Sequence, residues 1–184
     1  MDYKLDVYDV IALTLDSNNN ELHNRTTLQK LIYFETLKIE PLKTITYQNH
    51  FYGPFSYQVA AALDEMVAFS RINEQTSSTY NHESYHYMLT KPGKKYASDV
   101  KDKFSKQFNV ISDIVKICDK HCNLQANPLS YAAKAHYILV NGGKDQYTID
   151  DVRETAKKFE WNISEKDAEN GINLLEKLEL VRRT

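Results

Sequence analysis

Apolar side chains recur every three or four residues in the first part of the chain, which is the spacing of one helix face. This pattern predicts a helix over residues 5–15, a second that begins at Thr26 and a third that begins at Ser56. Thr26 and Ser56 are both good N-cap residues, and Gln29 completes a capping box with Thr26. We therefore expect three consecutive helices.

Two short strands are predicted after the third helix, at residues 71–75 and 85–90. The second, YHYML, alternates aromatic and polar side chains, and the polar stretch TSSTYNHE between the strands predicts a loose hairpin tip. Pro92 and Gly93 then end the strand and turn the chain into another helix. Three helices followed by a hairpin form the outline of a winged helix.

The same plan repeats near the C-terminus. An amphipathic helix begins at Pro128 with Asn127 as its N-cap, and Thr148 and Ser164 cap two more. Residues 180–182 form a short strand candidate. The sequence thus predicts a mainly α protein with a small β-hairpin wing, made of two winged-helix-like units joined by a long helix.

The joining segment has the longest apolar period in the chain. Between Val100 and Cys122 the apolar positions follow at steps of 4, 4, 3, 4, 3 and 4, and a helix of that length is roughly 33 Å long. Its stripe either packs within its own chain or pairs with its copy in a homodimer. We expect an N-terminal winged-helix unit at 1–96, the long connecting helix at 97–126 and a C-terminal winged-helix-like unit at 127–184.

The composition is that of an ordinary globular protein: 184 residues, 42% hydrophobic, 26% charged, with a net charge of −2. No apolar run approaches the roughly 18 residues that span a membrane, and the acidic start is unlike a signal peptide, so we expect a cytoplasmic protein. Residues 91–120 carry eight basic and four acidic side chains. This locally basic segment is the main resource for contacts with phosphates.

Two motifs could bind a metal. His82-Glu83-Ser84-Tyr85-His86 spells HExxH, but its chemistry needs a helix, and the string lies where a loop enters a strand. Cys118 and Cys122 fall on the apolar stripe and have no second Cys or His pair, so we interpret them as buried free thiols. We predict no metal, no cofactor and no enzymatic activity.

The run His50-Phe51-Tyr52-Gly53-Pro54-Phe55-Ser56 concentrates aromatic rings around a Gly-Pro turn before the third helix. One interpretation is that the rings of Phe51 and Phe55 anchor the turn in the core. The other is that the turn fixes how the third helix projects, which leaves Tyr57, Gln58 and Ala61 outermost.

Four strings together resemble a known group of proteins: RTTLQKLIYF at residues 25–34, HFYGPFS at 50–56, YMLTKPG at 87–93 and AAKAHYIL at 132–139. They look like the YwgA-like group of uncharacterised microbial proteins and, more distantly, like the Panacea antitoxin domain. The resemblance implies a winged-helix-related protein that regulates transcription in one branch and neutralises toxins in the other. Neither branch implies an active site.

Two functions follow. The first is a winged-helix transcriptional regulator that binds double-stranded DNA. Eight residues are the candidate DNA contacts: Arg25, Thr26, Thr27, Tyr57, Gln58, Lys91, Lys94 and Lys95. The second is a protein-interaction module of the antitoxin or adaptor type with no DNA binding. It is favoured by Asp64 and Glu65 on the outer face of the third helix, because carboxylates repel phosphates. The partners expected are therefore DNA, a second copy of the chain or a protein such as a toxin.

Overall fold

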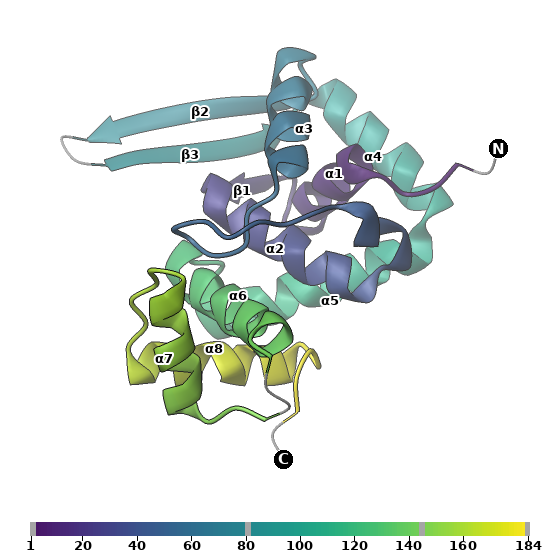
Figure 1. The fold of residues 1–184 in the computed structure, drawn as a ribbon. Coiled ribbons are helices and arrows are strands. Elements are labelled where there is room, and N and C mark those ends of the chain that lie inside the picture. The colour runs from purple at the N-terminus through teal and green to yellow at the C-terminus, as the bar shows by residue number, and fades with distance from the viewer. Residues whose placement is uncertain (1–2, 80–81, 144–145, 183–184) are drawn as a thin grey trace.

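The computed structural model describes residues 3–79, 82–143 and 146–182. The first half contains α1 (Val7–Ser17), β1 (Glu21–His23), α2 (Arg25–Lys38), the 3-10 helix η1 (Glu40–Thr44), α3 (Tyr57–Ala68), β2 (Ile72–Thr79) and β3 (His82–Leu89). The second half contains α4 (Lys91–Lys103), α5 (Ser105–Cys122), α6 (Ala126–Asn141), α7 (Ile149–Lys158) and α8 (Glu165–Lys177). The protein is mainly helical with a small antiparallel sheet, as predicted (Figure 1).

The sheet has three antiparallel strands in the order β1-β3-β2. Its long hairpin projects from the helices, beside α3 (Figure 1). Most of the stretch expected as a loose tip is paired strand, and residues 80–81 at the tip lie outside the described residues. β1 was not predicted, because three residues are too few to show a period. Leu22 anchors it in the core, opposite Tyr87 of β3.

Helix α1 lies at the centre of the N-terminal half. Every residue from Asp9 to Leu15 is buried, because α2, α3, α4 and α5 surround the helix. A helix buried all round needs apolar residues all round, and its consecutive apolar run provides them. Asp6 caps the helix and forms a capping box with Asp9. The second helix begins earlier than predicted, at Arg25 with Asn24 as N-cap. The predicted capping box of Thr26 and Gln29 does not form, because the Gln29 side chain bonds to the backbone of Ser56.

The long connecting helix is broken, which corrects the prediction. Phe104 has φ −122° and ψ 42°, so α4 ends at Lys103 and α5 starts at Ser105. The Phe104 ring packs on Tyr3, with ring centroids 5.7 Å apart. Ile111 and Val115 are buried within the chain, where α5 packs on α1 and α2. The stripe therefore belongs to the internal core, and the predicted homodimer would have to use another surface.

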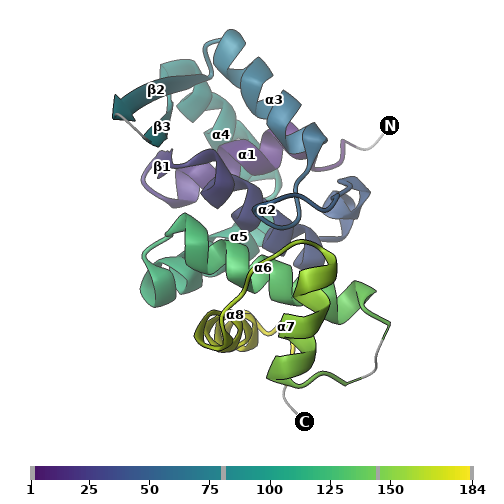
Figure 2. The same cartoon turned by 60° about the vertical axis from the view of Figure 1, so that its left-hand side comes forward.

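The two halves share one core through α6, which packs on α2 on one side and on α8 on the other (Figure 2). The approach of α8 is close at Gly171, where a Cβ atom would lie 3.0 Å from the backbone nitrogen of Ala132. Residues 180–182 pair with no strand, so the strand expected there is not formed. Among the described residues, no helix is both long enough and apolar enough to cross a membrane.

One carboxyl group is enclosed in this core. Glu35 of α2 is fully buried, and burial raises its pKa to about 8 despite the hydroxyl of Thr14 at 3.0 Å. The Thr14 hydroxyl has a single proton, which it shares between Glu35 and the closer Val10 carbonyl at 2.7 Å, so it compensates a Glu35 carboxylate only in part. The neutral form therefore fits the site without an unpaired charge.

This group makes stability depend on pH. Its folded pKa lies above the ordinary value of 4.5, so its stabilisation is complete below that value and is lost as the pH rises through about 8. We expect Glu35→Gln to remove this decline. Chemical denaturation from about pH 5 to pH 9 measures it: the difference in unfolding free energy between variant and wild type should grow in favour of the variant by a few kcal/mol. A pH-independent difference would contradict a buried, neutral Glu35.

Candidate functional site

The segment between η1 and α3 forms a closed loop, which we call the aromatic loop (residues 48–56). Gln48 and Phe55 exchange both backbone hydrogen bonds at 2.9 Å. A turn between them is closed by the Gly53 N–H, which donates to the His50 carbonyl at 2.8 Å. Gly53 has φ +90°, a conformation that strains other residues, so glycine is required there.

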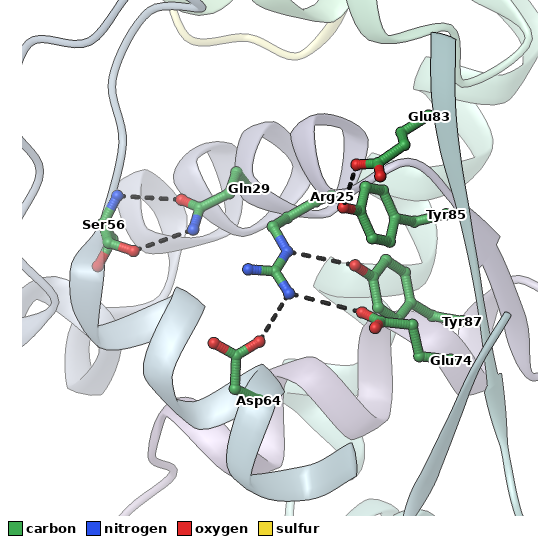
Figure 3. A network of polar contacts seen from close by, with 8 residues as sticks. All are labelled: Arg25, Gln29, Ser56, Asp64, Glu74, Glu83, Tyr85 and Tyr87. Carbon is green, nitrogen blue, oxygen red and sulfur yellow. Dashed lines mark hydrogen bonds and ion pairs between the residues drawn. The ribbon is translucent and has the colours of Figure 1, made fainter. Parts of the chain in front are cut away.

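Four side chains hold this loop by its backbone. The carbonyls of His50, Tyr52, Pro54 and Ser56 each accept a hydrogen bond from a side chain, at 2.7, 2.6, 2.6 and 2.9 Å. The donors come from the segment before α8, from α6 and from α2, in the order Trp161, Ser130, Lys30 and Gln29. Gln29 also accepts from the Ser56 N–H at 3.0 Å, so it holds that residue by two bonds (Figure 3). We call this set of contacts the clamp.

Because the backbone of the loop is tied inward, its rings face outward. Phe51 is 70% exposed, Tyr52 48% and Tyr57, the first residue of α3, 64%. Ring contacts run without interruption from Phe51 through Tyr52, His50 and Phe55 to Tyr57, with centroids 5.0 to 6.3 Å apart. We call Phe51, Tyr52 and Tyr57 the aromatic surface. Of the two interpretations of this run, a core anchor does not hold for Phe51, which lies on the outside.

A second polar network joins α2, α3 and the hairpin (Figure 3). Arg25 donates to Asp64 of α3 at 2.6 Å and to the Tyr87 hydroxyl at 3.2 Å, and it lies 3.5 Å from a carboxylate oxygen of Glu74. Beside it, Tyr85 donates to Glu83 at 2.9 Å. The guanidinium therefore fixes α3 against the hairpin, and its charge is already paired with two carboxylates.

The structure gives the eight predicted DNA contacts different roles. Arg25 is engaged as described, Thr26 is half-buried, and Thr27 is buried and donates to the Leu124 carbonyl at 3.0 Å. Tyr57 and Gln58 are exposed on the first turn of α3, where Gln58 accepts from the Thr46 N–H at 2.8 Å.

The three lysines of the set, Lys91, Lys94 and Lys95, are exposed on the first turns of α4. That helix starts beside the C-terminal end of α3, because the Thr90 N–H donates to the Arg71 carbonyl at 3.0 Å. Tyr57 and Gln58 lie at the other end of α3, whose 12 residues make a helix about 18 Å long. The predicted contacts therefore form two separate groups.

The sequence prediction did not include the four side chains of the clamp, or the buried Lys134 of α6, among its site residues. Gln29 was interpreted as part of a capping box, and Lys30 and Lys134 interrupt helix faces that otherwise read as apolar. The sequence signal for the two lysines is that each stands within a run of helix residues that are otherwise suited to burial. Trp161, the one tryptophan of the chain, gave no positional signal.

The candidate metal motifs stay separate as well. HESYH lies on strand β3, where positions four apart are about 13 Å apart along the strand, too far for one ion. Across the described ranges, the structure contains no cluster of three or more His, Cys, Asp or Glu side chains suited to a metal. Cys118 and Cys122 are free, and burial raises the pKa of the Cys118 thiol. A buried thiol of that kind is a poor nucleophile.

No protein-family model matches the chain. It is similar to a protein described as "Uncharacterized protein YwgA" from Bacillus subtilis (strain 168), with 29% identity over 80 residues. The aligned part covers 44% of this chain and 48% of that protein, so the chain spans about half the length of this relative. The similarity agrees with the YwgA-like resemblance over that part, while the antitoxin-domain resemblance gains no support.

The clamp predicts a specific loss of stability. Gln29→Ala leaves the buried N–H of Ser56 without its partner, at a cost of about 1–3 kcal/mol. It also removes one of two hydrogen bonds to the Ser56 carbonyl, which keeps the one from the Ala60 N–H, at a further cost of about 1 kcal/mol. We expect urea denaturation to show the unfolding free energy lowered by about 2–4 kcal/mol. The control is Gln75→Ala on an exposed position of β2, which should change it by less than about 0.5 kcal/mol. Equal effects of the two variants would show that the clamp contributes little.

Proposed function

We propose that this protein is a protein-interaction module built on a winged-helix scaffold, and that the aromatic surface is where its partner binds. The observation that carries this proposal is the clamp. Buried side chains from three parts of the chain donate four hydrogen bonds to the backbone of one loop, and that loop carries exposed aromatic rings. Aromatic side chains held in place before binding are typical of the residues that dominate protein interfaces.

The scaffold part of the proposal rests on topology. The order α1, β1, α2, α3, β2, β3 and the sheet order β1-β3-β2 place α3 beside a long hairpin, the arrangement of a recognition helix and its wing. The predicted second unit lacks a described strand, so only the N-terminal half supports this interpretation.

Charge on this scaffold favours a protein partner over DNA. The exposed side of α3 carries Asp64 and Glu65, and Glu74 of β2 lies close by. Arg25, the cation between helix and wing, is paired with two of these carboxylates. A duplex on this face would meet uncompensated negative charge.

The aromatic surface continues into a pocket that a partner chain could occupy. Tyr52 lines it together with Arg25 and Tyr85, and its volume is about 460 Å³. The pocket lies between the aromatic loop, the start of α2 and the hairpin, next to the start of α6. A bound segment could therefore extend from the exposed rings toward the wing.

Site-specific photo-crosslinking tests the proposed function. A photoreactive phenylalanine analogue at position 51 or 57, in cells that express the protein, should crosslink one discrete protein. The same analogue at Phe69, 76% exposed at the end of α3, is the control and should not. Identical crosslinks from all three positions would contradict a binding site on the aromatic surface.

DNA binding is the second candidate function, favoured by the exposed Lys91, Lys94 and Lys95. If it operates, replacing all three by Gln should weaken binding to every duplex and flatten the salt dependence by about 0.9 log unit per lost phosphate contact. We expect instead that fluorescence polarisation with random duplex shows no tight binding at moderate salt. Tight binding that the triple variant weakens would replace our proposal with this one.

A further inference from the structure

A lysine without an anionic partner lies at the base of the aromatic surface. Lys134 lies on α6 and is only 7% exposed. Its Nζ lies 5.5 Å from the centroid of the Trp161 ring and 5.8 Å from those of Phe51 and Tyr131. No described residue gives it a hydrogen-bond acceptor or a carboxylate, so its contacts with these rings are its only polar stabilisation.

A second buried cation lies near it. Lys30 is 1% exposed, and its one hydrogen-bond partner is the Pro54 carbonyl at 2.6 Å. Burial, and then the charge of Lys134, lower the pKa of Lys30 to about 7, while burial lowers the pKa of Lys134. Within the described part of the chain, no carboxylate offsets either shift. The lowered pKa of Lys30 lets that residue lose its charge, whereas an ammonium on Lys134 without a counter-charge is costly to keep out of water, and an incoming carboxylate would reduce that cost.

The Lys134 ammonium is only half-buried, less deeply than that of Lys30, although its stem is covered. Gly53 packs on the stem, and a Cβ atom there would lie 2.9 Å from Lys134 Cγ. The described side-chain polar atoms cut off from solvent without a partner are Tyr47 Oη and Arg153 Nε, and Lys134 Nζ is not among them. The ammonium is therefore not fully cut off from solvent, and one of the rings beside it, Phe51, belongs to the aromatic surface.

We propose that the aromatic surface binds an acidic segment of a partner protein, in which an Asp or Glu carboxylate pairs with Lys134 and a neighbouring apolar side chain packs on Phe51. This inference rests on the proposed function and adds the chemistry of the partner. An ion pair formed between aromatic rings is shielded from water and is therefore stronger than one at an open surface. Carboxylates nearby on the protein are already engaged, since Arg25 holds Asp64 and Tyr85 holds Glu83.

Selection from a random 12-residue peptide library displayed on phage, with the full chain immobilised, tests this inference. We expect enriched peptides to contain Asp or Glu next to an apolar residue. Lys134→Met should lower the affinity for the selected peptide at least tenfold. Replacing the acidic residue of the peptide by Asn or Gln should lower the affinity by a similar factor, and this change leaves the protein unaltered. Lys95→Met, an exposed lysine on α4, is the matched control and should leave affinity unchanged.

The outcomes separate the two proposals. Peptides that lose affinity with Phe51→Ala and Tyr57→Ala but carry no acidic residue, and are indifferent to Lys134→Met, would overturn the acidic partner and leave the interaction surface standing. Peptides indifferent to Phe51→Ala and Tyr57→Ala, or no enrichment at all, would overturn both. Melting temperatures of the variants show whether each is folded, and the peptide substitution gives the answer even where Lys134→Met is not.

Discussion

The structure depends on the hydrogen bonds that hold the alternate carbonyls of the aromatic loop. Gln29 and Lys30 of α2 reach the loop from the N-terminal half, and Ser130 and Trp161 reach it from the C-terminal half. The loop is thus the place where polar groups of both halves meet, on top of the apolar contact between α2 and α6. Because each donor is matched to a backbone acceptor, the core tolerates these polar side chains.

That arrangement explains two features that would otherwise be unfavourable. A glycine with positive φ and large exposed rings both destabilise an isolated loop, but here the glycine lets the loop lie on the Lys134 stem and the rings are presented in fixed positions. Helix α3 starts directly from the loop, with Ser56 as N-cap accepting from the Val59 N–H at 3.3 Å. Arg25 then fixes the same helix to the hairpin. Loop, helix and hairpin are therefore positioned together.

Much of the fold could be predicted from the sequence, because helices with regular apolar spacing and clear caps, such as those capped by Ser56 and Thr148, form where local signals are strongest. The errors lie where tertiary contacts decide. The apolar period runs on through Phe104, yet that residue leaves the helix and packs on Tyr3. Gln29 fits a capping box locally but pairs with Ser56, and β1 exists only because β3 is there to pair with it.

The site was harder to predict, since its defining residues are polar side chains in helix interiors. Lys30 and Lys134 become meaningful only when the loop covers them. The exposed lysines on α4 give a clear charge signal in the sequence, but the fold places them at the far end of α3. Local charge predicts a phosphate contact, whereas only the fold shows which cations are paired, buried or apart.

If the clamp keeps the aromatic surface rigid before any partner binds, ¹⁵N relaxation of the free protein will show it. We predict backbone order parameters near 0.85 for the amides of Gln48, Gly53 and Phe55, equal to those of the helices. Values below about 0.6 across the aromatic loop would contradict the account, because the clamp would then not hold the rings in place.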